Sequence, residues 1–183
     1  MQEARKYQLQ YSLIYSLIVA GKSARFTEKK CSKFISYLQD ETECVMPLSA
    51  VQQLTKEGLL ELLHKAKTGN YTKLYKALKQ LSTANIDLEK CKPDELEKIH
   101  GIGPKTARFF IMWNRPDERY AALDVHILAW LREQGYNAPK STPPSGCRYN
   151  ELEQIFIQEA DKRGMTPREL DAEVWKEGAN YEE

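Results

Sequence analysis

The chain has 183 residues, of which 42% are hydrophobic and 10% aromatic, and this apolar content excludes a wholly disordered protein. With 27 Lys and Arg against 26 Asp and Glu, the formal net charge is +1, which argues against a strongly basic nucleic-acid binder. The total hides an asymmetry, because residues 1–92 carry 15 basic and 9 acidic side chains whereas residues 93–183 carry 12 and 17. Either chance or a basic face for a polyanion accounts for this asymmetry.

The apolar residues recur mostly at intervals of three and four, which predicts helices, and no segment alternates as a half-buried strand would. The fold class is therefore expected to be all-α. Breaks at glycine and proline place the helices in chain order over residues 9–20 (ending at Gly21), 26–38, 54–66, 71–81, 93–99, 104–113, 125–135, 149–163 and 167–175.

The cysteines show no C-x-x-C pair and no histidine at metal-ligand spacing; they are Cys31, Cys44, Cys91 and Cys147. We interpret them as four buried free thiols in a reducing compartment. The longest mostly apolar run, Tyr11–Ala20, is half of the length that a membrane span needs, and the first residues lack a signal-peptide layout. We therefore expect a cytoplasmic protein with no membrane partner.

Five lysines between positions 65 and 79 have no acidic residue among them; they are Lys65, Lys67, Lys73, Lys76 and Lys79. They form either a solvated helix face or a surface that follows the phosphates of a nucleic acid. Residues 151–183 carry 10 acidic against 4 basic side chains, so that segment is not expected to lie on DNA.

The most informative stretch is a short helix opened by Pro93, a Gly101-Ile102-Gly103 turn, and a second helix opened by Pro104. Glycine permits a positive φ and leaves no side chain between the backbone and an approaching phosphate. The N–H groups and the positive dipole end at the start of the second helix then form a clamp for a nucleic-acid backbone, independent of base sequence. The alternative is an ordinary turn between two helices.

Lys105 follows this turn by two residues, and 19 positions later Asp124 stands in the sequence Leu123-Asp124-Val125-His126. This arrangement resembles the helix-hairpin-helix-GPD superfamily of base-excision DNA glycosylases. The resemblance implies two helical lobes with the active site in the cleft between them, and one glycosylase unit over residues 1–183. It also implies a helix-hairpin-helix motif at 93–114, a Pro-containing loop with the catalytic Asp and its helix at 115–135, and C-terminal helices at 149–183 that pack with the N-terminal helix.

Two features indicate which branch of the superfamily the chain resembles: Lys105 is present, and a C-terminal cluster of four cysteines is absent. The endonuclease III and adenine-glycosylase branches carry four closely spaced C-terminal cysteines, whereas only Cys147 follows the turn here, and two other branches lack the lysine. The chain thus resembles the 8-oxoguanine DNA glycosylase/AP lyase branch, although Phe109 departs from the pocket cysteine of its eukaryotic-type members. The implied protein is a prokaryotic, nucleoid-associated monomer that acts on double-stranded DNA containing a damaged base. It needs no iron–sulfur cluster and no metal held by side chains, and its hairpin carbonyls can bind a monovalent cation.

The resemblance assigns roles to individual residues. Lys105 is expected to be the nucleophile, and the alternative is a surface lysine that contacts a phosphate. Asp124 is expected to stabilise positive charge on the sugar, and the alternative is that it only caps its helix. The candidate contacts to the DNA backbone are His100, Gly101, Ile102, Gly103, Thr106 and His126. The candidate base pocket comprises Phe109, Trp113, Asp171 and Trp175. For the three aromatic residues, packing in the core is the alternative role. A glycosylase for another modified base and a non-catalytic helix-hairpin-helix module are the competing functions.

Overall fold

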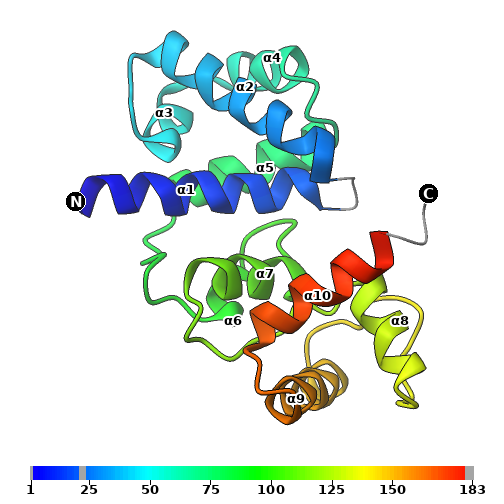
Figure 1. Cartoon of the computed structure of the whole chain (residues 1–183). Coiled ribbons are helices and arrows are strands. Elements are labelled where there is room, and N and C mark those ends of the chain that lie inside the picture. Colours follow the sequence, from blue (N-terminus) through cyan, green and yellow to red (C-terminus); the bar gives the residue numbers. More distant parts are fainter. Residues whose placement is uncertain (1, 21–23, 180–183) are drawn as a thin grey trace. The chain divides into compact units, whose positions relative to one another are not determined.

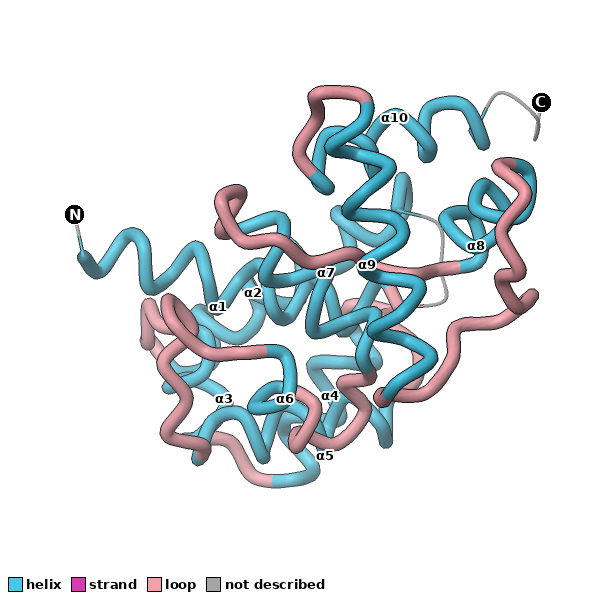
Figure 2. Tube along the Cα trace, turned by 90° about the horizontal axis from the view of Figure 1, so that it is seen from below, coloured by secondary structure: helices cyan, strands magenta, loops and turns pink. Residues whose placement is uncertain are grey.

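The computed structural model describes residues 2–20 and 24–179, and over these residues it contains helices and loops but no strand (Figure 2). The all-α class is confirmed. In chain order the helices are α1 (Gln2–Val19), α2 (Ala24–Thr42), α3 (Pro47–Gln53), α4 (Lys56–Lys65), α5 (Tyr71–Thr83), α6 (Pro93–Leu96), α7 (Pro104–Asn114), α8 (Val125–Glu133), α9 (Cys147–Lys162) and α10 (Pro167–Ala179).

The chain divides into two compact units, Met1–Ile102 and Gly103–Glu183. In the first unit α1 packs against α2, α3 and α5, and α4 packs against α2 and α5 (Figure 1). Apolar residues at intervals of three and four give α1 one apolar face, which is buried in this core. That face consists of Leu9, Leu13, Ile14, Leu17 and Ile18. In the second unit α10 packs against α7, α8 and α9.

Several helix boundaries differ from the expectation: α1 begins at Gln2 rather than near residue 9, and α2 continues to Thr42 rather than ending at 38. The predicted helix over 54–66 begins only at Lys56, because Thr55 is its N-cap and accepts a hydrogen bond from the Gly58 N–H at 3.1 Å. The residues before Thr55 belong to α3, a separate helix that the sequence did not predict because seven residues are too few to establish a period. The helix after Pro93 ends at Leu96 rather than near residue 99, and the chain then turns. The predicted end at Gly21 lies outside the described residues.

The expectation of four buried thiols is wrong. Cys31 and Cys91 are buried, but Cys44 is partly exposed and Cys147 is exposed at the first position of α9. Burial raises the pKa of the Cys31 thiol to about 12, so this thiol is inert. No helix in the described ranges combines the length and the apolar character that a membrane crossing requires.

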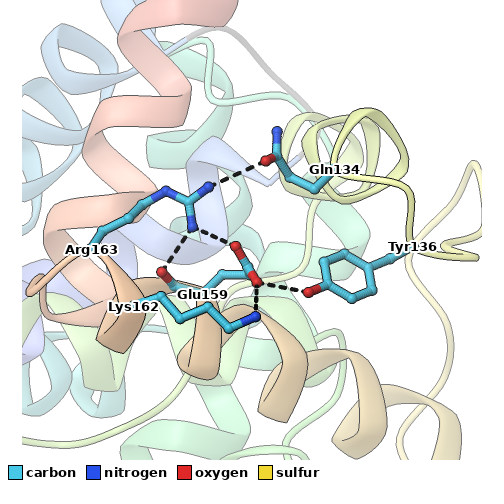
Figure 3. Close-up of polar contacts among 5 residues, drawn as sticks. All are labelled: Gln134, Tyr136, Glu159, Lys162 and Arg163. Atoms are coloured by element: carbon cyan, nitrogen blue, oxygen red, sulfur yellow. Dashed lines mark hydrogen bonds and ion pairs between the residues drawn. The ribbon is translucent and has the colours of Figure 1, made fainter.

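A polar cluster around Glu159 fixes α9 to the segment that follows α8 (Figure 3). The Glu159 carboxylate accepts hydrogen bonds from Lys162 Nζ at 2.6 Å, from Arg163 Nη1, and from the Tyr136 hydroxyl at 2.7 Å. These bonds, the one from Lys162 first, lower the pKa of Glu159 to about 2. Arg163 also donates to Gln134 Oε1 at 3.2 Å, so the cluster joins the end of α9 to the residues that follow α8.

Candidate active site

The Gly-Ile-Gly turn has a fixed conformation in the first unit. Gly101 adopts a positive φ of 80°, and the Ile102 N–H donates to the Ile99 carbonyl at 3.0 Å. The Gln80 amide of α5 binds the segment just before the turn, donating to the Lys98 carbonyl at 3.1 Å and accepting from the His100 N–H at 2.7 Å. The His100 and Ile102 N–H groups are thus used within the protein, while the His100 residue itself remains exposed.

The start of α7 presents unused hydrogen-bond donors. No residue in the described ranges accepts a hydrogen bond from the N–H of Gly103, Lys105 or Thr106, as is usual for the first turn of a helix. A Cβ built on Gly103 would meet no atom within 4 Å, so the space beside this N-cap is open. An anion can therefore approach these N–H groups and the positive end of the helix dipole.

Lys105 and Asp124 lie side by side in the second unit. The distance from Lys105 Nζ to Asp124 Oδ2 is 3.8 Å, and the two side chains retain 25% and 12% of their exposure. The Lys105 ammonium also lies 5.0 Å from the centre of the Phe109 ring, one turn further along α7. The Lys105 amino group and the Asp124 carboxylate thus share one partly buried position, which solvent can still reach.

Asp124 divides its two oxygens between two tasks. Oδ1 accepts hydrogen bonds from the His126 and Ile127 N–H groups, both at 3.0 Å, and thereby caps α8. Oδ2 is left to face Lys105. The cap holds the carboxylate in one orientation, so the capping interpretation and the catalytic interpretation are compatible.

Asp171 of α10 is a second carboxyl near this pair. Its residue is 2% exposed, and Oδ1 has no hydrogen-bond partner among the described residues. Burial, and then the charge of Asp124, raise the pKa of Asp171 to about 7, while the charge of Lys105 acts in the opposite direction. The sequence pointed to Asp171 only as a candidate residue of the base pocket, and the structure adds that it lies within electrostatic reach of Lys105 and Asp124.

The raised pKa of Asp171 predicts a pH-dependent loss of stability. The folded protein holds the proton more tightly than the unfolded chain does, so the free energy of unfolding falls as the pH rises from about 4 to about 7. A pKa rise from 3.8 to about 7 corresponds to a loss on the order of 4 kcal/mol. We expect Asp171→Asn to remove this loss, so that the variant gains stability relative to the wild type at pH 8 but not at pH 4.

Denaturant unfolding across this pH range measures the effect. Asp161→Asn is the matched control, because it makes the same change at a half-exposed position, where Asp161 forms an ion pair with Arg119. Parallel stability curves for the wild type and Asp171→Asn would contradict the prediction.

The aromatic candidates form two pairs. Phe109 and Trp113 lie 5.9 Å apart on α7, and the guanidinium of Arg168 lies 4.6 Å from the Trp113 ring. His126 and Trp175 lie 4.3 Å apart and join the start of α8 to α10. Trp113 and Trp175 are 37% and 40% exposed, so neither is a core residue.

The sequence missed a buried polar network that fixes the loop before Asp124. Glu153 of α9 accepts hydrogen bonds from Arg108 Nε and from the Ala121 N–H, both at 2.9 Å. The Tyr149 hydroxyl accepts from the Leu123 N–H at 3.1 Å and donates to the Ala121 carbonyl at 2.9 Å. Because Arg108 belongs to the helix of Lys105, the network connects that helix to the residue preceding Asp124. Its members are far apart in the sequence, so no local pattern reveals them.

Removal of the Tyr149 hydroxyl should therefore loosen Asp124 without unfolding the protein. If the protein has the glycosylase activity that the resemblance implies, we expect Tyr149→Phe to lower the rate of base release about tenfold while DNA affinity stays unchanged, since a displacement of 1 Å costs up to about 10²-fold. Single-turnover kinetics at saturating enzyme measure this rate. Tyr136→Phe is the control, because it removes a comparable hydroxyl from the Glu159 cluster. Equal rates for the two variants would assign Tyr149 to stability alone.

No group of three or more His, Cys, Asp or Glu side chains in the described ranges is arranged to hold a metal ion. The monovalent cation on the turn carbonyls stays a prediction. Two of those carbonyls, of Lys98 and Ile99, already accept hydrogen bonds from Gln80 and from the Ile102 N–H.

These features define an all-helical protein with a glycine turn, an open helix N-terminus and an adjacent lysine–aspartate pair. No family model matches the chain. Among solved structures it is similar to the 8-oxoguanine DNA glycosylase of Thermotoga maritima, with a TM-score of 0.68 and 23% identity, over 95% of this chain and 81% of that one.

The 8-oxoguanine DNA glycosylase of Methanocaldococcus jannaschii is similar as well. Its structure has a TM-score of 0.65 and 22% identity, over 93% of this chain and 77% of that one. The same archaeal glycosylase/lyase in complex with a 15mer DNA containing 8-oxoguanine gives a TM-score of 0.65 and 21% identity, covering 93% and 80%. The chain thus has the fold of these glycosylases, as expected from its motifs. The cleft between the lobes and the packing of residues 149–183 stay predictions.

Proposed function

We propose that this protein is a DNA glycosylase with AP lyase activity that excises 8-oxoguanine from double-stranded DNA. The observation that carries the proposal is the position of Lys105 Nζ, 3.8 Å from Asp124 Oδ2, in the first turn of the helix that follows the glycine turn. A shared fold with two 8-oxoguanine DNA glycosylases, one of them crystallised with damaged DNA, supports the substrate class.

In this proposal the Gly-Ile-Gly turn and the start of α7 act as a helix-hairpin-helix clamp on the DNA backbone. The free N–H groups of Gly103, Lys105 and Thr106 bind one phosphate, and His100 and His126 are further contacts to the DNA backbone. Gly101 and Ile102 give the clamp its shape. This grip fixes the register of the protein on DNA while the damaged nucleotide is extruded from the duplex.

The chemistry begins at C1′ of the extruded nucleotide. As the glycosidic bond breaks, its electron pair leaves with the base, and positive charge develops on the sugar. Asp124 Oδ2 stabilises that charge, and the deprotonated amine of Lys105 forms a bond to C1′. Opening of the sugar ring gives a Schiff base, from which loss of a C2′ proton eliminates the 3′ phosphate. Asp124 stays in its capped orientation throughout these steps, so α8 does not need to move.

We assign recognition of the base to Asp171 and to the exposed aromatics. The unpartnered Oδ1 of Asp171 can accept a hydrogen bond from a purine N–H, which offsets the cost of leaving it buried and unsatisfied. Trp175, Trp113 and Phe109 offer ring faces on which a base stacks.

A panel of duplexes, each carrying one lesion, tests the proposal. The purified full chain is incubated with each duplex, base release and strand cleavage are measured, and borohydride is added to reduce a Schiff base to a stable adduct. We expect release, cleavage and an adduct with the 8-oxoguanine duplex. An adduct confined to another lesion would move the assignment to a glycosylase for that base. Binding without release or adduct on every duplex would leave a non-catalytic DNA-binding module.

A further inference from the structure

The five lysines between positions 65 and 79 occupy different environments in the structure. Lys79 Nζ donates to the Val51 and Leu54 carbonyls, at 3.0 and 2.6 Å, and so satisfies the end of α3. Lys65 Nζ lies 4.3 Å from the centre of the Tyr37 ring. Lys67 follows α4 in a left-handed backbone conformation, with a φ of 53°. Lys73 and Lys76 are exposed on α5, whereas the exposed Lys65 and Lys67 lie at and just after the end of α4.

Lys73 lies directly against the Gly-Ile-Gly turn. Its Cε is 2.6 Å, and its Cγ 3.0 Å, from the position that a Cβ would take on Gly101. The turn cannot move away from this side chain, because Gln80, on the same helix, holds the Lys98 carbonyl and the His100 N–H. Because its aliphatic stem packs against Gly101, the Lys73 side chain is restricted in conformation, and its ammonium is held at the turn before DNA binds.

The charge of Lys73 has no counter-charge. Its ammonium makes no hydrogen bond and no ion pair with any residue that the structure describes. α5 carries three lysines and no acidic residue over Tyr71–Thr83, and Lys76 lies one turn from Lys73. Like charges at this spacing repel each other, so an anion bound beside Gly101 would be stabilised by both lysines.

We propose that Lys73 binds a DNA phosphate beside the Gly-Ile-Gly turn and extends the clamp by one backbone contact. This inference rests on the proposed function only in that the turn meets DNA. The aliphatic stem of Lys73 packs on Gly101, the first glycine of the turn, so its ammonium can reach a backbone phosphate that meets the turn there. The contact is to phosphate and carries no base or lesion preference.

Salt dependence of binding to undamaged DNA tests this contact without reference to catalysis. The slope of log Kobs against log salt concentration counts the phosphates that cations neutralise, at about 0.9 for each. We expect Lys73→Met, which keeps the apolar stem over Gly101, to lower the magnitude of that slope by about 1 and to weaken binding equally for intact and lesion-bearing duplexes. Fluorescence anisotropy of a labelled duplex in a KCl series measures both quantities.

Lys56→Met is the matched control, because it removes the same charge from an exposed position at the start of α4 in the same unit. Lys73→Gln provides a second variant, and circular dichroism checks that all three fold. A slope reduced by Lys73→Met and Lys73→Gln but not by Lys56→Met supports the contact. An unchanged slope, or an equal reduction in the control, overturns it even if base release is normal. Absence of base release with a reduced slope would remove the enzymatic proposal and leave this contact in place.

Discussion

Lys105→Gln is expected to abolish the borohydride adduct and to lower strand cleavage by on the order of 10³-fold or more, the scale expected when a nucleophile is removed. Glutamine has nearly the same length and hydrogen-bonding capacity as lysine but no amine that can form a Schiff base. Its side chain fits the partly exposed position beside Asp124 and Phe109 without a cavity. Folding and DNA affinity should therefore change little, while covalent chemistry is lost.

The same measurement separates the two interpretations of this lysine. If Lys105 only bound a phosphate, Lys105→Gln would weaken DNA binding but leave the adduct and the cleavage rate intact once the DNA is saturated. Lys98→Gln serves as the control, because Lys98 is exposed just before the turn and contributes only its backbone carbonyl to a hydrogen bond. An adduct of normal yield from Lys105→Gln at saturation would contradict the assignment of Lys105 as the nucleophile.

The structure shows which parts of the fold and of the site are encoded locally. Residues 71–81 and 104–113 were predicted as helices because their ends carry their own signals and their apolar period continues for several turns. α3 was missed because its seven residues, Pro47–Gln53, show neither feature clearly. The Asp124 cap was likewise predictable, since an aspartate accepting the N–H groups two and three residues later is a local arrangement.

The supporting contacts of the site were not predictable in this way. Glu153 and Arg108 are 45 residues apart, and Tyr149 and Leu123 are 26 apart, so their pairing depends on how α9 packs in the second unit. The lysines of the basic segment were indistinguishable by composition. Only packing separates Lys79, which satisfies two carbonyls, from Lys73, which lies on Gly101. Residue types and spacing therefore indicated the reacting pair, whereas burial and long-range contacts determine what orients it.

Asp124→Asn is expected to lower the rate of base release by about 10²–10³-fold while the protein stays folded, because it removes the charge and keeps the cap. Asparagine is as good an N-cap as aspartate, so its Oδ1 can still accept the His126 and Ile127 N–H groups. What it loses is the negative Oδ2 beside Lys105, and with it the stabilisation of positive charge on the sugar. Single-turnover release of the base, measured after alkaline cleavage of the strand, isolates this step from the lyase reaction.

Two further variants separate charge from capping. Asp124→Ser should reproduce the loss of rate, because serine caps the helix but carries no charge. Asp87→Asn should leave the rate unchanged, although Asp87 also accepts a backbone N–H, that of Glu89 at 3.0 Å. If base release by Asp124→Asn matched the wild type while only the free energy of unfolding changed, Asp124 would be a helix cap alone. The glycosylase mechanism would then need another anion near C1′, and Asp171 is the buried carboxyl in electrostatic contact with the same lysine.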